Sequence, residues 1–295
     1  MRTSELGRLH SRQASLERAS GNMDKVQRQL STGRKITVAS DDAAGSALAL
    51  GHRRNINFEN QMRRNLESGR AVLNAGEAAL GSGTDLLQRA RELTVNAASG
   101  TLSQSDRIVV ALEIDQIIAG LAQLGNTQFG GAYLFSGHQS NAPAYAVTGN
   151  PPTAVTYQGD AGQRLRRVSE QDTVAVNVPG VEAFASIFDD LIALRDDLNG
   201  AAPASAINAH LTTIDDGLER MIAARAAMGA RANRFETAQS VSEQRNVGLQ
   251  ELRSSIEEID LPSTIVEFTA AQNALEAALG AIGRTSGMTL LDFLR

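Results

Sequence analysis

Residues 9–30 read LHSRQASLERASGNMDKVQRQL, and this stretch decides the fold class. Its apolar residues recur at the three-four spacing of a coiled-coil seam: Leu9, Leu16, Ala19, Met23, Val26 and Leu30. A helix with so narrow an apolar stripe cannot bury that stripe by itself. The stretch therefore predicts a long helix that packs against a partner helix.

A second seam lies at the C-terminal end of the chain. Its apolar residues are Leu249, Leu252, Ile256, Ile259, Leu261, Ile265, Phe268, Leu275, Leu279 and Ile282. Its register shifts near Pro262, which predicts a kink or a restart of the helix. We expect the two ends to pair with each other, with other copies of the chain, or with both. The predicted subunit-assembly residues are Leu9, Leu16, Met23, Leu30, Ile256, Ile259, Phe268, Leu275, Leu279 and Ile282.

The distribution of proline separates helical segments from a different central segment. Proline is absent before Pro143, five of the six prolines lie from Pro143 to Pro203, and the sixth is Pro262. Because proline is excluded from helix interiors, the proline-free part reads as long helices. We predict a mainly α fold: a long helical rod whose terminal helices pair as a coiled coil, with a small β-rich insert. The predicted domains are 1–40 with 255–295 for assembly, 41–135 with 181–254 for the rod, and 136–180 for the tip.

Residues 66–97 combine large and small side chains on one helical face. Leucine occupies one heptad position at Leu66, Leu73, Leu80 and Leu87. The other position holds Gly69, Gly76, Gly83, Ala90 and Ala97. Each glycine costs about 1 kcal/mol of helix propensity against alanine, so we expect close packing of a neighbouring helix to compensate.

Two connecting regions carry turn and strand signals. The first helix is predicted from Thr3 to Ser31 with Gly33 after its end, and Ser40 is predicted to cap the next helix ahead of Asp41 and Asp42. Within the insert, strands are predicted at 155–158, 165–168 and 173–178, because glycine, proline and asparagine clusters bound them.

Composition argues against several classes of function. The net charge of -5 disfavours a nucleic-acid binder, and the absence of cysteine leaves no disulfide or thiolate site. The four histidines, at positions 10, 52, 138 and 210, are scattered. We therefore expect no enzyme activity, cofactor or metal. No cleavable signal peptide and no run of eighteen apolar residues is visible, so we expect no membrane span, and these features alone favour a cytoplasmic protein.

Short motifs at both ends resemble the flagellins and their junction-protein relatives. The N-terminal motifs are QLSTGRKI at 29–36 and SDDAAG at 40–45, and the returning helix carries ANRFE at 232–236. The tail, from 257–260 to 290–294, resembles the C-terminal helix of the same family. The family-motif residues are Ser40, Asp41, Asp42, Asn233, Arg234 and Phe235. These motifs occur in the family's order and at its distances from the termini.

Three central segments resemble the hook-filament junction branch of this family. They are GGAYLFSG at 130–137, YQGD at 157–160 and VNVPG at 176–180. The resemblance implies a non-enzymatic, extracellular structural subunit that joins hook to filament and is exported through the flagellar type III pathway without a cleaved signal. It further implies self-assembly with identical subunits, contact with a neighbouring hook-associated protein and flagellin, and an export chaperone. It replaces the cytoplasmic expectation from composition.

Other functions stay open at this level. A filament flagellin would share both helical ends and differ in polymerising by itself. A cytoplasmic coiled-coil adaptor would explain the heptads but not the motifs at 40–45 and 233–235. An enzyme would need a constellation of side chains that only the fold could assemble.

Overall fold

The computed structural model describes residues 2–291, and within this range it describes the burial of residues 7 and 10–283. The chain divides into two compact units. Unit 1 comprises residues 1–58 and 245–295, and unit 2 comprises residues 59–244. The three-domain division expected from the sequence stays a prediction.

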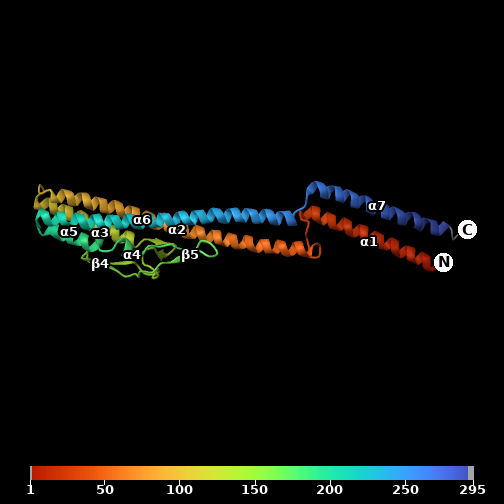
Figure 1. The fold of residues 1–295 in the computed structure, drawn as a ribbon, viewed down its shortest axis with the longest axis horizontal. Coiled ribbons are helices and arrows are strands. Elements are labelled where there is room, and N and C mark those ends of the chain that lie inside the picture. The colour runs from red at the N-terminus through yellow and green to blue at the C-terminus, as the bar shows by residue number, and fades with distance from the viewer. Residues whose placement is uncertain (1, 292–295) are drawn as a thin grey trace. The chain divides into compact units, whose positions relative to one another are not determined.

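Unit 1 is built on two helices from opposite ends of the chain. These helices are α1 (Arg2–Thr32) and α7 (Leu261–Leu291), which pack against each other. Figure 1 shows them side by side and running in opposite directions, so that the two termini lie at the same end of the pair. The first helix ends as predicted, because Gly33 adopts a φ of +68° that glycine tolerates without steric cost. The antiparallel pair therefore uses the two apolar stripes that the sequence places at the chain ends.

Unit 2 is a helical bundle. Its helices are the part of α2 (Ala43–Ala98) after residue 58, α3 (Gln104–Gly125), α5 (Ile187–Asn199) and the part of α6 (Ala204–Glu257) before residue 245. Figure 1 shows α3 and α5 lying beside α2 and α6. Leu66, Leu73, Leu80 and Leu87 are all fully buried. The heptad spacing of the sequence thus becomes the core of this bundle.

Helix α3 is the most apolar helix of the bundle. Ser103 caps its start in a reciprocal arrangement with Asp106, which satisfies backbone donors of the first turn. By length and composition α3 is apolar enough to cross a membrane, and half of that apolar window, 50%, is buried inside the protein. A core helix meets the same criterion, and Ile114, Ile118 and Leu121 are indeed fully buried.

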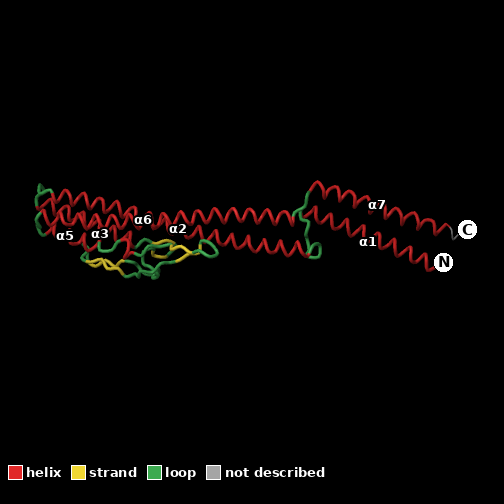
Figure 2. Tube along the Cα trace, viewed as in Figure 1, coloured by secondary structure: helices red, strands yellow, loops and turns green. Residues whose placement is uncertain are grey.

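The β structure of unit 2 consists of short antiparallel pairs, drawn in yellow in Figure 2. The pairs are β1 (Gln128–Phe129) with β2 (Ala132–Tyr133), β3 (Tyr145–Thr148) with β4 (Ala154–Tyr157), and β5 (Leu165–Arg167) with β6 (Thr173–Ala175). The predicted strands at 155–158, 165–168 and 173–178 correspond to β4, β5 and β6. Strands β1 and β2, which have only two residues each, and strand β3 were not predicted.

The β segments share one hydrophobic core with the helices. Strand β3 contacts α3, and β4 contacts α5. The short helix α4 (Gly180–Ala183) precedes α5, and Ala185 between them has a φ of 38°. The core continues without a break from the leucines of α2 to Phe135, Tyr145 and Val178. The insert is therefore anchored on the bundle by buried side chains.

Candidate functional site

The terminal seam of unit 1 is partly buried. On α1, Val26 is buried at 4% exposure, and four more seam residues are half-buried: Leu16, Ala19, Met23 and Leu30. On α7, the face with reduced exposure consists of Thr264, Phe268, Ala271, Leu275, Ala278 and Ile282. These positions follow a regular three-four spacing, as expected for two helices that pack along a stripe. The Leu9 side chain lies outside the described residues.

The predicted register of α7 is wrong at three residues. Leu261, Ile265 and Leu279 are 55%, 53% and 52% exposed, so none of them lies in the seam with α1. The cause is a restart of the helix: α6 ends at Glu257 and α7 begins at Leu261, with Pro262 in its first turn. Ile256 and Ile259, both half-buried, belong to the end of α6 and to the break. One continuous heptad across this break is therefore not formed.

Within unit 1, hydrogen bonds connect the segment between α1 and α2 with the end of α6 and the residues after it, and an ion pair connects α2 with α6. We call this region the joint. Arg34 and Glu258 form an isolated antiparallel bridge, in which the Lys35 N–H donates to the Glu257 carbonyl over 2.6 Å. The Ile259 N–H donates to the Gly33 carbonyl over 3.2 Å. The buried Glu257 carboxylate lies 2.7 Å from an Arg53 guanidinium nitrogen. The segment after α1 is thereby fixed to the segment between α6 and α7.

The SDDAAG motif shapes this joint. The Asp41 carboxylate accepts hydrogen bonds from the Thr37 N–H, the Thr37 hydroxyl and the Val38 N–H. Led by the Val38 N–H, these bonds lower the pKa of Asp41 to about 2. Asp42 caps α2 by accepting from the Gly45 N–H over 2.9 Å, so the prediction that Ser40 is the cap is wrong. Ser40 lies in the preceding turn, because the chain uses Asp41 to close the loop before the helix starts.

Gly45 completes the joint by leaving space. A Cβ atom at this position would come within 2.8 Å of the Ile36 Cδ1 atom and 2.9 Å of the Asp42 Cγ atom. Gly45 is buried, because the Ile36 and Asp42 side chains pack against it. The last residue of the motif is thus determined by close packing rather than by a turn.

In unit 2, the small residues of α2 face large residues of α6. A Cβ on Gly69 would come within 2.9 Å of the Phe235 ring, one on Gly76 within 2.7 Å of Met228 sulfur, and one on Gly83 within 2.8 Å of Met221 sulfur. The contacts step by seven residues in opposite directions along the two helices. The predicted close approach is confirmed.

The three side chains of the N-R-F element have different surroundings. Phe235 is fully buried against Gly69. Arg234 is exposed and lies 2.8 Å from the Asp172 carboxylate, which follows β5. The Asn233 side chain is exposed. The element therefore secures α2 on one side and the β5–β6 hairpin on the other.

The three central segments that resemble junction proteins meet in one place, which we call the hub. The hub consists of residues 133–138, 157–162 and 176–180. The Tyr157 hydroxyl is shared between the Phe135 carbonyl at 2.9 Å and the Asp160 carbonyl at 2.8 Å. The Gly180 N–H donates to the same Phe135 carbonyl over 2.7 Å. Because Phe135 and Ser136 are fully buried, these bonds form inside the protein, where an unpaired polar group is costly.

Two side chains organise the polar part of the hub. The Asp160 carboxylate accepts from the His138 N–H at 2.9 Å and the Gly162 N–H at 2.7 Å, and these bonds lower its pKa. Asn177, only 1% exposed, accepts from the Arg164 N–H and donates to the Gly162 carbonyl. Arg231 of α6 donates to the Asn177 carbonyl over 2.8 Å. The hub is thus bonded internally and to the helical bundle.

Aromatic rings fill the space beneath the hub. Tyr145 packs against Tyr157, Phe184 and Phe188, with ring centroids 4.9–5.4 Å apart. Phe135 meets Phe184 edge to face at 5.4 Å. Burial raises the pKa of the Tyr145 hydroxyl. Although aromatics make up only 4% of the sequence, five of them gather here, so their clustering matters more than their number.

The bundle contains a buried ion pair that we did not predict from the sequence. Arg195 of α5 lies 2.9 Å from the Asp115 carboxylate of α3, and both side chains are less than 10% exposed. Arg195 also donates to the Pro152 carbonyl over 2.6 Å and contacts Asp196. The heptad pattern could have indicated this pair, since Asp115 and Arg195 stand next to core positions Ile114 and Leu194.

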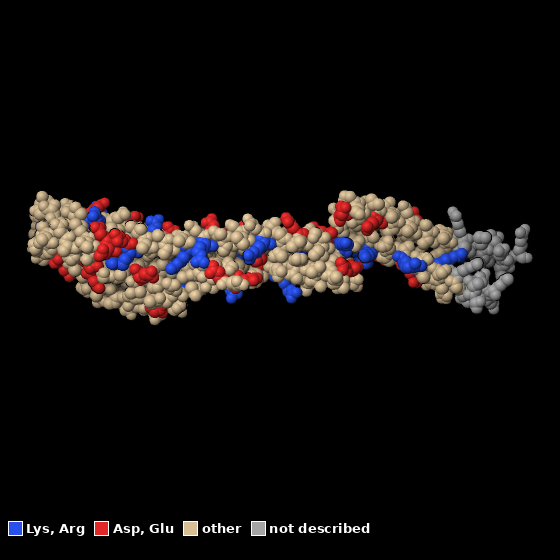
Figure 3. Space-filling model, viewed as in Figure 1, with Lys and Arg blue, Asp and Glu red and all other residues tan. Residues whose placement is uncertain are grey.

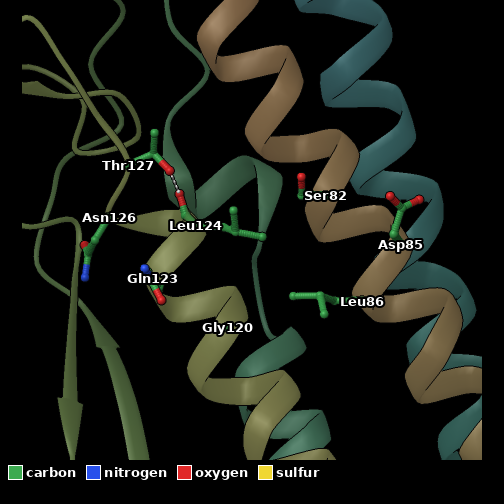
Figure 4. A pocket seen from close by; sticks show the side chains of 8 residues that line it. All are labelled: Ser82, Asp85, Leu86, Gly120, Gln123, Leu124, Asn126 and Thr127. Atoms are coloured by element: carbon green, nitrogen blue, oxygen red, sulfur yellow. Dashed lines mark hydrogen bonds between the residues drawn. The ribbon is translucent and has the colours of Figure 1, made fainter.

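Unit 2 contains an open hollow of about 640 Å³ between α2 and α3. Its lining comes from Ser82, Asp85 and Leu86 of α2, from Gly120, Gln123 and Leu124 of α3, and from Asn126 and Thr127 beyond the end of α3 (Figure 4). Asp85 is the ionisable residue of this lining. Among the described residues, no group of three or more His, Asp or Glu is placed to hold a metal ion.

Comparison with known proteins accounts for both ends of the chain. Residues 5–140 match the bacterial flagellin N-terminal helical region, and residues 211–294 match the bacterial flagellin C-terminal helical region. The chain is 29% identical over 272 residues to the flagellar filament 30.7 kDa core protein of Treponema maltophilum, covering 90% of each chain. It is 26% identical over 301 residues to flagellar hook-associated protein 3 of Salmonella typhimurium, covering 92% of each.

The fold is shared with a solved structure. A putative flagellar hook-associated protein from Vibrio parahaemolyticus superimposes with a TM-score of 0.69 at 21% identity, over 74% of this chain and 100% of that one. The SDDAAG motif lies inside the first matched region, and the N-R-F element lies inside the second. The chain belongs to the bacterial flagellin family.

Proposed function

We propose that this flagellin-family protein is a structural subunit that joins the flagellar hook to the filament. The observation that carries the proposal is the hub. The three segments that resemble junction proteins are far apart in sequence, yet buried hydrogen bonds at Phe135, Asp160 and Asn177 hold them together. Segments that are bonded to one another in this way form one structural feature, not separate chance matches.

Similarity along the whole chain supports the same role. The likeness to the Salmonella hook-associated protein extends through both helical ends and the insert. Members of a structural family of this kind act by assembly, and the described part of the chain offers surfaces for it. Leu261, Ile265, Val266 and Leu279 expose more than half of their side chains on α7. We assign this exposed face, together with the half-buried seam, to contacts with other subunits.

The partners follow from this position. Identical subunits would surround each copy, with another hook-associated protein on one side and flagellin on the other. An export chaperone would hold the chain before assembly. Export would use the flagellar type III pathway without a cleaved signal, so that the protein functions outside the cell.

A second candidate function is that of a filament flagellin. The observation that favours it is the likeness to the Treponema filament core protein, which is slightly higher in identity than that to hook-associated protein 3. A filament subunit would polymerise into long filaments when purified. A junction subunit would instead form a short zone and would not elongate by itself.

Immunogold labelling of sheared flagella tests the proposal. Antibody against residues 136–180 should place gold only at the boundary between hook and filament. A strain that lacks the gene serves as the labelling control. Gold along the whole filament would contradict the junction role and support the filament flagellin instead.

A loss-of-function experiment separates the two roles further. Without this protein, cells should assemble hooks and release unpolymerised flagellin into the medium, because the filament has no base on which to grow. Cells that retain filaments of ordinary length but lose this protein from them would show that it is one filament component among several.

A further inference from the structure

Unit 2 carries a concentration of arginine on one hairpin and the helix next to it. We call it the arginine patch: Arg164, Arg166, Arg167, Arg231 and Arg234. Strand β5 is exposed along its whole length, so Arg166 and Arg167 project into solvent. Figure 3 shows blue side chains gathered where α6 lies beside this hairpin. The overall charge of the protein is -5, so the positive charge of this patch is opposite in sign to the net charge of the protein.

Hydrogen bonds hold the arginines close together. The Arg164 N–H and an Arg231 side-chain N–H both donate to Asn177, while Arg234 pairs with Asp172 at the other end of the hairpin. Burial, and after it the positive charge of Arg166, lowers the pKa of Arg164. The buried Arg164 Nε atom has no hydrogen-bond acceptor among the described residues. Like charges held together in this way favour a negatively charged partner.

The same unit carries a complementary surface on α4 and α5. We call it the acidic face: Glu182, Asp189, Asp190, Asp196 and Asp197. Two pairs of aspartates repeat at a spacing of seven residues, which places them on one side of α5. Glu182, Asp189 and Asp196 are exposed. In Figure 3, red side chains gather over α5, away from the arginine patch.

We propose that the arginine patch of one copy docks on the acidic face of a second copy of this chain. Charge complementarity between two separate surfaces of one protein is the argument for this partner, because each copy then offers what its neighbour lacks. A contact between unlike surfaces leaves one of each free, so it continues from copy to copy around a ring or along a helix. The proposal rests on the role as a repeating subunit and adds a lateral contact in unit 2.

The test uses charge reversal in the full-length protein. Sedimentation velocity compares the wild type with Arg166→Glu/Arg167→Glu and with Glu182→Lys/Asp189→Lys at low and at moderate ionic strength. The wild type should self-associate at low ionic strength, and salt should weaken the association because it screens exposed charges. Each variant alone should raise the dissociation constant of self-association at least about tenfold, because like charges then face each other.

Rescue makes the experiment specific. An equal mixture of the two variants should associate again, since the intact acidic face of one meets the intact arginine patch of the other. The matched control is Arg63→Glu/Arg64→Glu, which changes the same charge on the exposed side of α2. This control should associate like the wild type.

Three outcomes would overturn the inference. They are association of both variants at wild-type strength, failure of the mixture to recover, and binding of the wild type to a heparin column without any self-association. The last result would assign the arginine patch to a polyanion instead. None of these outcomes alters where immunogold places the protein, so failure of this inference can be told apart from failure of the junction role.

Discussion

Two heptad stripes of the same kind behave differently in the two units. Leu66, Leu73, Leu80 and Leu87 of α2 are fully buried, whereas Leu16, Met23 and Leu30 of α1 are only half-buried. In unit 2 the leucines of α2 join a core that includes residues of α3, α5 and the hub. The glycines on the same helix let α6 approach closely. In the described part of unit 1, the stripe of α1 meets α7.

The difference shows that a heptad repeat predicts which residues pack against another helix, but not how completely those residues are buried. A two-helix contact covers one side of each helix and leaves the flanks in water. A bundle with an added β layer covers several sides. We therefore regard unit 2 as the part that is stable in one chain, and unit 1 as the part with apolar surface available to other subunits. Five experiments test this contrast.

The largest expected effect is at Phe235. Phe235→Ala should lower the free energy of unfolding of unit 2 by about 3–5 kcal/mol, because it removes a fully buried ring and leaves a cavity beside Gly69. Urea unfolding followed by circular dichroism measures the loss. Phe129→Ala is the control, since Phe129 is 40% exposed and should matter far less. Equal losses for both variants would refute the assignment of Phe235 to the core.

The buried ion pair should give the next largest effect. Asp115→Ala should destabilise unit 2 by about 3 kcal/mol, near the lower end for breaking a buried pair, because Arg195 keeps the Pro152 carbonyl and Asp196. Replacing both partners, Asp115→Leu with Arg195→Met, should cost less than the single change. If the double variant were the less stable one, the pair itself would be strongly stabilising.

Two glycine substitutions compare the units directly. Gly69→Ala should lower the stability of unit 2 by about 1–3 kcal/mol, since the new methyl group would press on the Phe235 ring. Gly21→Ala in α1 should raise helix stability by up to about 1 kcal/mol, since no atom outside the adjoining helix backbone lies within 4 Å of the new group. Thermal unfolding of both variants measures the signs. A stabilising effect at Gly69 would mean that the two helices are not closely packed there.

Charges placed in the terminal seam should spare unit 2. Leu16→Asp and Leu275→Asp should each change the unfolding free energy of unit 2 by no more than about 0.5 kcal/mol, yet block incorporation into flagella, because a carboxylate would enter an apolar contact. Electron microscopy of complemented cells gives the readout. Ser11→Asp, at an exposed position of α1, is the matched control. Normal incorporation of either seam variant would remove these residues from the assembly surface.

The smallest effect concerns pH at the joint. The pKa of Asp41 is lowered from 3.8 to about 2 when the joint is formed. The folded joint therefore binds fewer protons than the unfolded chain, so the stabilisation is present above about pH 4 and is lost as the pH falls through about 2. The Thr37 and Val38 amide signals in NMR spectra should follow this titration. In Asp41→Asn they should be insensitive to pH over this range, and an unchanged titration would contradict the assignment.

The sequence predicted the helices well and their partners less well. The first helix, the glycine-leucine face of α2 and three of the strands follow from spacing, glycine and proline alone. The register of α7 followed only in part: Phe268, Leu275 and Ile282 lie on the face with reduced exposure as predicted. Because the helix restarts at Leu261, Thr264 and Ala278 replace Ile265 and Leu279 on that face. The capping role of Asp42 was missed for a similar reason, since Ser40 is equally good as a cap by residue type.

The family-motif residues show the same limit within the candidate site. Sequence resemblance singled out Asp41, Asp42 and Phe235 as a set, but their physical roles emerge only from contacts. Asp41 closes a loop, Asp42 caps a helix, and Phe235 fills the space that Gly69 leaves. The assembly roles of the terminal residues stay predictions.

By itself, the sequence determined that this protein is helical, that its two ends carry matching apolar stripes, and that it resembles the flagellin family. Periodicity and backbone preferences are local, so these properties can be read from neighbouring residues. Only the tertiary structure decided which stripe is fully buried, which residues pair inside the core, and that three distant segments form one hub. Those outcomes depend on contacts between residues far apart in the chain, which no local pattern encodes.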